Sequence, residues 1–290
     1  YGDAPNLLVN DQDLEFYDAT VRCLDQIRAL PSMADMPNGV GFIKEIGTTK
    51  HTIKIQSTTD GNKCKSVEDG RFVRLHDAFH QGSGYSIAEE LTYAFTVAGR
   101  RGISMQHVAR QLTMGLSPVT IHTDRNVAKQ QPWQINPTVE GRIGAQLIAL
   151  KDGTTTECSR EMQNGLIRLL RNYLRPGNGA RAGVFFNAYK TVACALDAKG
   201  TTRPPAIGLV HELVHAWRNV AGLRLFDDAQ ACGLDDDEVM TTGFPPYTYE
   251  KYTENKFRLV WHVGGGEKLD VRTDYRTYAA EKAAAKLQAK

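Results

Sequence analysis

The sequence predicts a mixed α+β fold, and three observations support this. Residues 14–30 and 160–174 place apolar side chains at helical spacing. Around Ile53 and Ile55, apolar and polar residues alternate as they do in a half-buried strand. Residues 203–222 are apolar on nearly every face of a helix, which is typical of a buried helix. With 290 residues, 41% of them apolar, the chain can bury a sizeable core.

The composition excludes several classes of protein. The chain has 35 Lys+Arg against 33 Asp+Glu, and a net charge of +2 gives no reason to expect a nucleic acid as partner. No uninterrupted apolar run reaches about 18 residues, so we expect no membrane span. Five scattered cysteines without CxxC spacing fit neither a disulfide framework nor a cysteine zinc knuckle. We interpret them as small buried side chains in a reducing compartment.

Helices and strands are expected in the following order along the chain. The helix over 14–30 ends at Pro31, because proline cannot continue it. Residues 39–58 are predicted to be extended, and residues 86–116 helical. After the helix over 160–174, the sequence predicts a turn over 177–183, a strand within 184–193, the buried helix over 203–222 and a helix over 252–261.

These elements are expected to belong to one domain, over residues 14–278. About residues 80–160 are then a largely helical insertion, residues 1–13 a flexible segment, and residues 279–290 a helical or disordered tail. The chain begins with Tyr1 and not with Met, so we expect that a preceding segment has been removed and that a targeting signal would not be visible.

The strongest motif lies in the predicted buried helix. His211-Glu212-Leu213-Val214-His215 matches HExxH. Residues four apart on a helix differ by about 40° around the axis and about 6 Å along it, so the imidazoles of His211 and His215 can both reach one ion at about 2.0–2.1 Å. Glu212 lies about 100° away from His211, where it can miss the metal and act as general base on a metal-bound water.

The alternative is a buried helix whose two histidines have ordinary hydrogen-bond partners. The apolar flanks of the motif favour a metal site, because a buried helix that carries two histidines and a glutamate needs partners for all three side chains. A metal ion and its water would supply them together. A catalytic zinc usually has three protein ligands and keeps a fourth position for water.

The third ligand is expected downstream, on another element. Residues 234–246 predict a short helix with an acidic first turn. Glu238 is the predicted ligand, and Thr241 or Thr242, one turn later, would support it by hydrogen bonding. The alternative for Glu238 is an acidic helix start in solvent.

Two further segments carry candidate residues. Metal-bound histidine needs its other ring nitrogen fixed, usually by a carboxylate, and Glu254 on the helix over 252–261 is the candidate. An ordinary exposed glutamate is the alternative. Arg272 and Tyr275 lie about one helical turn apart and could stabilise a developing oxyanion, although a surface pair is the default interpretation.

In this order, HELVHA, DEVMTTG, YTEN and RTDY resemble the NleD-type zinc metallopeptidases, which bacterial type III systems inject into host cells. The same order is more distantly similar to the light chains of clostridial neurotoxins. The resemblance is strongest over about residues 203–278 and covers roughly half of the chain. It implies a zincin-like α+β domain with the HExxH motif on a buried helix and a small mixed sheet.

The resemblance also implies roles for individual residues. Zinc would bind His211, His215 and Glu238, and Glu212 would be the base. Asp237 and Glu254 would be the carboxylates behind the imidazoles. Arg272 and Tyr275 would stabilise the tetrahedral intermediate. Asp237 departs from the family pattern, which has glutamate at that place, and the region of about 80–160 is longer than in the compact effectors.

The sequence therefore predicts a zinc-dependent endopeptidase. The resemblance implies a monomeric effector that the bacterium secretes and that cleaves a specific host protein, such as a mitogen-activated protein kinase, in the host cytoplasm. Two alternatives stay open. One is a metal-stabilised protein that binds a host protein through the region of about 80–160 without catalysis, and the other is a metallopeptidase toxin that acts on bacteria.

Overall fold

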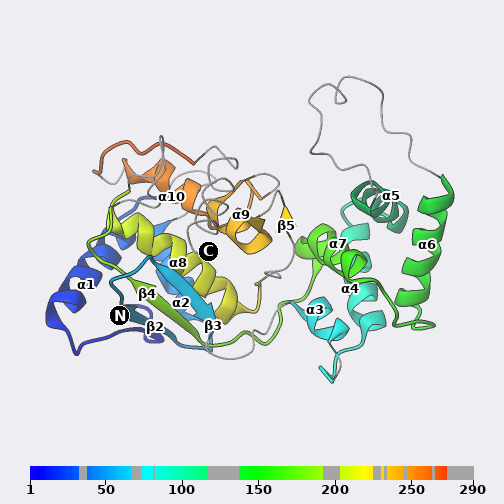
Figure 1. Ribbon diagram of the computed structural model, residues 1–290, viewed down its shortest axis with the longest axis horizontal. Helices are drawn as coiled ribbons and strands as arrows, with labels where there is room; N and C mark the ends of the chain where they lie inside the picture. The colour runs from blue at the N-terminus through cyan, green and yellow to red at the C-terminus, as the bar shows by residue number, and fades with distance from the viewer. Residues whose placement is uncertain are drawn as a thin grey trace, which may run out of the picture. The chain divides into compact units, whose positions relative to one another are not determined.

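The chain divides into two compact units in the computed structural model (Figure 1). The first unit comprises residues 1–71 and 178–290, and the second comprises residues 72–177. The helical insertion expected over about residues 80–160 lies within the second unit. The residues that the structure describes are 1–32, 38–66, 73–80, 82–116, 137–191, 203–224, 230–231, 234–244, 247–262 and 265–272.

A four-stranded mixed sheet organises the first unit. Its order is β1-β2-β4-β3, in which β1 (Leu7–Val9), β2 (Ile53–Ser57) and β4 (Ala182–Phe186) are parallel and β3 (Lys63–Ser66) is antiparallel to β4. The sequence prediction of a strand is confirmed for 53–57 and within 184–193. The N-terminal segment, expected to be flexible over 1–13, instead supplies β1, whose residue Leu7 is fully buried and pairs with Ile53.

The helices of the first unit confirm most of the predicted ones. They are α1 (Leu14–Arg28), α2 (Gly39–Gly47), α8 (Pro205–Ala221), α9 (Asp236–Thr242) and α10 (Glu254–Trp261), and a short hairpin of β5 (Gln230–Ala231) and β6 (Leu234–Asp235) precedes α9. The C-terminal tail over 279–290 lies outside the described residues.

Helix α2 corrects the prediction that 39–58 is extended throughout. Its buried residues are Gly39, Phe42, Ile43 and Ile46, a spacing of three, four and seven that matches one face of a helix. The side chain of Asn38 caps the helix by accepting a hydrogen bond from the Gly41 N–H at 3.0 Å. The expectation of a strand was therefore wrong for 39–47, because the helical spacing of its apolar residues outweighs the glycines.

A single glycine allows α2 to approach α1. A Cβ atom at Gly39 would lie 1.8 Å from the carbonyl oxygen of Ile27, a distance that no side chain can adopt. Only glycine therefore permits this close approach at the start of α2.

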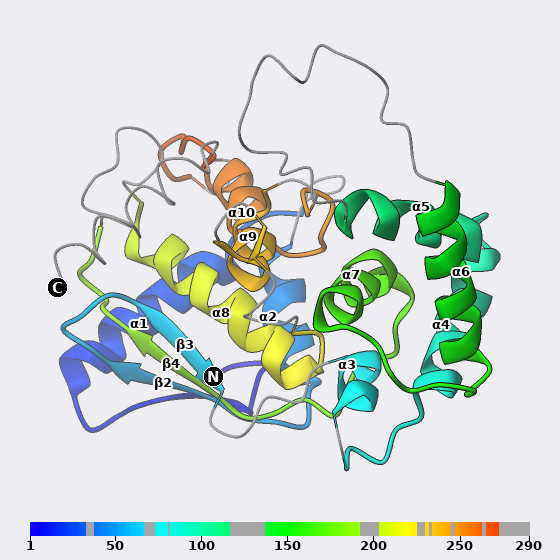
Figure 2. The same cartoon turned by 45° about the vertical axis from the view of Figure 1, so that its right-hand side comes forward.

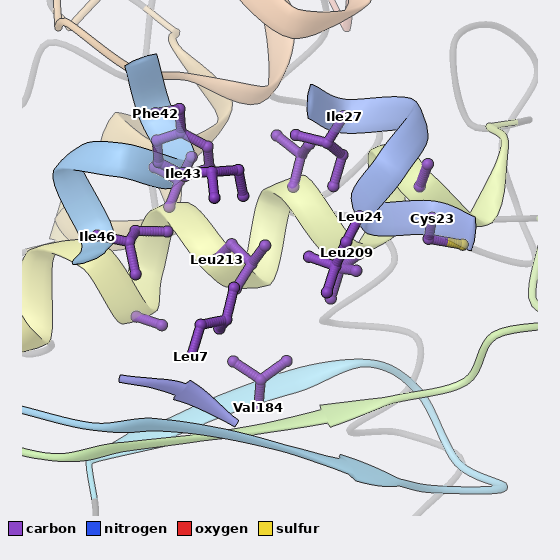
Figure 3. Close-up of a cluster of buried hydrophobic side chains, with 14 of the residues drawn as sticks. Leu7, Cys23, Leu24, Ile27, Phe42, Ile43, Ile46, Val184, Leu209 and Leu213 are labelled. Atoms are coloured by element: carbon purple, nitrogen blue, oxygen red, sulfur yellow. The ribbon is translucent and has the colours of Figure 1, made fainter. Parts of the chain in front are cut away.

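The hydrophobic core of the first unit surrounds α8. In Figure 3, side chains of α1, α2 and α8 gather on one side of the sheet, where strand residues Leu7 and Val184 meet them. Leu209 and Leu213 of α8 are fully buried there, as are Leu24 and the other apolar residues of the α1 face. This packing holds α8 in the middle of the unit and fixes the direction in which its polar side chains point.

The second unit is built from helices in its described residues (Figure 2). They are α3 (Arg74–Phe79), α4 (Ile87–Gly99), α5 (Met105–Leu116), α6 (Pro137–Lys151), α7 (Arg160–Leu170) and the 3-10 turn η2 (Arg171–Tyr173). The helices predicted over 86–116 and 160–174 are confirmed, with a break after Gly99 where Gly102 adopts a positive φ of 80°. No helix among the described residues has the length and apolar character that crossing a membrane requires.

Replacing Leu24 by alanine tests the core around α8. Leu24 is fully buried, so we expect Leu24→Ala to lower the free energy of unfolding by about 2–5 kcal/mol through lost burial and a residual cavity. Leu14 begins the same helix but is 73% exposed, and Leu14→Ala is the matched control, expected to change stability by about 0.5 kcal/mol or less. Denaturant unfolding measures both. Equal effects of the two substitutions would contradict the described core.

Candidate metal centre

Helix α8 carries the HExxH residues in a buried environment. Every residue from Ala206 to Val220 is buried. The helix begins with Pro205, a position where the missing N–H leaves no hydrogen bond unmade. It ends at Gly222, whose φ of 68° closes the helix in the left-handed conformation that glycine adopts readily. The polar side chains within α8 therefore depend on partners from other elements.

Three side chains from two elements converge on one point. The Nε2 atoms of His211 and His215 are 3.3 Å apart. Glu238, on α9, reaches them with both carboxylate oxygens, at 3.3 Å from Nε2 of His211 and 3.2 Å from Nε2 of His215. His211, His215 and Glu238 form a group that could hold a metal ion, and both histidines are buried while the side chain of Glu238 is 29% exposed.

The separations within this group fit a tetrahedral ion. Two ligand atoms at about 2.0–2.1 Å from an ion and at a tetrahedral angle lie about 3.3–3.4 Å apart. The two Nε2 atoms match this value at 3.3 Å, and each of them lies 3.2–3.3 Å from a different carboxylate oxygen of Glu238. The imidazoles of His211 and His215 thus present their Nε2 atoms at metal-binding distances from one another, without rearrangement of α8.

A carboxylate fixes the far side of each imidazole. Nδ1 of His211 donates to Oε2 of Glu254 at 2.8 Å, and Nδ1 of His215 donates to Oδ2 of Asp237 at 2.7 Å. These bonds fix one proton of each ring on Nδ1, so Nε2 is the atom that a metal ion would bind in place of a proton. Both carboxylates were predicted for this position, Asp237 by resemblance alone, and the alternative of an exposed Glu254 is wrong because this residue is fully buried.

The neighbourhood of His215 includes a threonine and a buried arginine. The Thr241 hydroxyl lies 3.2 Å from Nδ1 of His215, and Nη1 of Arg218 donates to the same hydroxyl at 2.5 Å. Arg218 also lies 3.9 Å from Oδ1 of Asp237. Thr241, predicted to support Glu238, therefore contacts the imidazole of His215 and the guanidinium of Arg218.

Glu254 has three guanidinium groups around it. Nε of Arg258 donates to Oε1 at 2.8 Å, while Nη1 of Arg203 and Nη1 of Arg272 lie 3.3 and 3.4 Å from Oε2. Burial alone would raise the pKa of Glu254, but the charges of Arg203 and Arg258, with the hydrogen bond from His211, hold this pKa well below its usual range. Glu254 is therefore ionised and rigidly placed behind His211.

The charge balance around the imidazoles favours a cation. Burial would lower the pKa values of His211 and His215, yet hydrogen bonds and charges of Glu238, Glu254 and Asp237 raise both. Burial alone would raise the pKa of Glu238, but the charges of His215 and His211 and the hydrogen bonds from both imidazoles hold this pKa well below the usual range. Protons and metal ions compete for such a centre, because a metal takes the place of the imidazole protons.

The remaining predicted site residues are Glu212, Arg272 and Tyr275. Glu212 is buried, 5% exposed, and burial raises its pKa although the neighbouring imidazoles lower it. Arg272 lies beside Glu254, and its backbone exchanges two hydrogen bonds with the side chain of Asn255, at 2.8 and 2.9 Å. Tyr275 lies outside the described residues.

Four residues of this network were not predicted from the sequence: Arg203, Arg218, Asn255 and Arg258. Arg258 follows Glu254 by four residues, an ion-pair spacing on a helix that could have identified it. Asn255 belongs to the YTEN segment, but the motif resemblance implies no role for it. Arg203 and Arg218 have no local pattern that marks them, because their partners come from α9 and α10.

Comparisons with known proteins add nothing to the assignment of the metal centre, which rests on the geometry of its residues. No protein-family model, no curated protein and no solved structure matches the chain. The resemblance in motif order is thus a hypothesis, and the metal centre is supported by the contacts described above.

Replacing a ligand tests the metal centre. His215→Ala removes one of three ligand side chains, so we expect the chain to lose one equivalent of tightly bound metal, with an affinity loss above about 100-fold. His262→Ala is the control, because His262 is exposed and lies after α10. Elemental analysis after dialysis measures the metal. Parental stoichiometry in the His215 variant would contradict the assignment.

Replacing Glu254 tests the support behind His211. Glu254→Gln keeps the size of the side chain but removes its charge, so we expect the metal affinity to fall by about 10–100-fold. Competition with a chelator of known affinity measures this change. Glu267→Gln, at an exposed position, is the control, and an unchanged affinity in the Glu254 variant would show that His211 does not depend on this carboxylate.

Proposed function

We propose that the chain is a zinc-dependent endopeptidase with a zincin-like first unit. The observation that carries the proposal is the grouping of His211, His215 and Glu238 at metal-binding distances, with Glu212 next to the first ligand on the same buried helix. Two histidines and one glutamate are a common ligand set of catalytic zinc, whereas structural zinc usually has four protein ligands and relies on cysteine.

An accessible centre also favours catalysis over a purely structural role. The described residues provide three candidate ligands at this point, and Glu238 remains 29% exposed at its side chain. A substrate could therefore approach from the side of Glu238, while the carboxylates of Asp237 and Glu254 hold the imidazoles from behind.

Peptide hydrolysis assigns a role to each residue. When bound, zinc would polarise the scissile carbonyl and make water nucleophilic near neutral pH. Glu212 accepts a proton from the attacking water and gives it to the leaving amine as the C–N bond breaks. The burial that raises its pKa makes this carboxylate a stronger base than an exposed glutamate.

Positive charge near Glu254 would assist the same reaction. Arg272 belongs to the RTDY segment, and with Tyr275 it would donate hydrogen bonds to the oxyanion of the tetrahedral intermediate. Its guanidinium lies 3.4 Å from Glu254, which in turn bonds to His211. The proposal thus assigns Arg272 to the oxyanion and Glu254 to the positioning of this arginine and of His211.

The substrate class follows from the motif resemblance. The NleD-type enzymes act on host mitogen-activated protein kinases, so a kinase of this type is the first substrate to test, with action in the host cytoplasm after bacterial secretion. An antibacterial toxin would contain the same centre and would cleave a bacterial protein. The second unit is the proposed region for recognition of the substrate.

Glu212→Gln tests the catalytic role. The change keeps the side-chain size and the metal ligands, so we expect metal content to stay at the parental level while turnover falls by about 100-fold or more. Purified chain and variant are incubated with host lysate, and new protein N-termini are mapped by mass spectrometry. Glu161→Gln, exposed in the first turn of α7, is the control and should cleave as the parent does.

The outcomes separate the alternatives. Cleavage at the parental rate by the Glu212 variant would remove Glu212 as base. Absence of new termini in lysates of host and bacterial cells, with metal bound in the parent, would favour the metal-stabilised binding protein.

A further inference from the structure

A second pair of histidines in the second unit repeats the spacing of the first. His76 and His80 lie four residues apart, from α3 to its C-terminal end, within the sequence HDAFH. Their Nε2 atoms are 3.1 Å apart and their ring centroids 4.4 Å apart. The corresponding separations for His211 and His215 are 3.3 and 4.9 Å. In each pair, therefore, the two Nε2 atoms face one another.

The geometry of this pair fits a metal ion. Two nitrogens that lie 3.1 Å apart, each about 2.05 Å from one ion, subtend an angle of about 100° at that ion. This angle lies between those of square-planar and tetrahedral coordination, which Cu²⁺ and Zn²⁺ adopt with imidazole ligands. The same separation also suits an N–H···N hydrogen bond between two neutral rings, and this is the interpretation that the experiment must exclude.

The surroundings differ on the two sides of the pair. His76 is 1% exposed, and Oδ1 of Asp77 lies 3.9 Å from its Nδ1, which is too far for a hydrogen bond. His80 is exposed and lines a cavity of about 570 Å³ together with Tyr85 and Glu157. A buried imidazole thus faces an accessible one, and the cavity beside His80 leaves room for water or a further ligand.

We propose that His76 and His80 bind a second divalent transition-metal ion, of the zinc and copper class, in the second unit. The ion is held by two imidazoles, and water from the cavity completes its coordination. With two protein ligands instead of three, this site binds more weakly than the centre on α8. The proposal goes beyond the peptidase function and does not depend on it, because it concerns different residues in a different compact unit.

Zinc stoichiometry in a His215→Ala background tests the second site. This variant removes one of the three ligands of the centre on α8, and loss of the remaining zinc on further substitution at His80 identifies the second pair. Isothermal calorimetry measures the zinc bound when the full chain is titrated with zinc. We expect about two equivalents of zinc per chain for the parent and about one for His215→Ala. The double variant His215→Ala/His80→Gln should then bind none. His107→Gln, an exposed histidine on α5, is the matched control and should leave the count unchanged.

Substitution at an exposed position keeps the experiment independent of folding. His80 is exposed, so His80→Gln should retain the melting temperature of the metal-free parent. Electron paramagnetic resonance of Cu²⁺ added to the His215→Ala variant should show coupling to nitrogen ligands, and His80→Gln should remove most of it. Zinc binding by His215→Ala that is absent, or that persists undiminished in the His80 variant, would overturn the proposal and favour the hydrogen-bonded pair.

Discussion

Two buried carboxylates behind two buried imidazoles are the interaction on which the candidate site depends. A helix as fully buried as α8 must find a partner for every polar side chain that it carries, because an unpaired polar group in the core costs free energy. Asp237 and Glu254 satisfy the Nδ1 atoms of His215 and His211, and so orient both Nε2 atoms toward Glu238. Without these carboxylates each imidazole would lose the hydrogen bond that fixes its ring orientation, and the three candidate ligands would be held less well around a common point.

The carboxylates are in turn supported by arginines. Glu254 alone is surrounded by Arg203, Arg258 and Arg272, of which Arg258 is fully buried. Burial of several charges in one place is tolerated only when each is paired. The network therefore joins residues from before α8, from α10 and from the segment after α10 into one electrostatic unit. A centre assembled in this way is specified by long-range pairing as much as by its ligands.

Local patterns were sufficient to predict much of the fold and the ligand group. The spacing of apolar residues predicted α1, α4, α7 and α8, and alternation predicted β2. HExxH and the acidic start of the 234–246 segment predicted the three candidate ligands, because helix geometry determines which side chains share a face. The error at α2 arose where glycines and apolar residues are mixed, since helical spacing over nine residues competes there with extended alternation.

Tertiary pairing was beyond the reach of these patterns. Arg203 and Arg218 bond to residues more than twenty positions away, and β1 joins the sheet through a pairing with β2 across more than forty residues. The sequence marked about residues 80–160 as a largely helical insertion, but the bounds of the second compact unit, 72–177, depend on contacts among its helices that no local pattern shows.

The position of β4 in the sheet affects the order in which the protein can fold during synthesis. β4 lies between β2 and β3, but it emerges from the ribosome only after the residues from 72 to 177. Domains tend to fold as units during translation, so the helical unit can become compact while β2 and β3 still wait for the strand that joins them. Helix α8 and the residues that face its histidines are made later still. Metal uptake at this centre would therefore be among the last steps in maturation of the nascent chain.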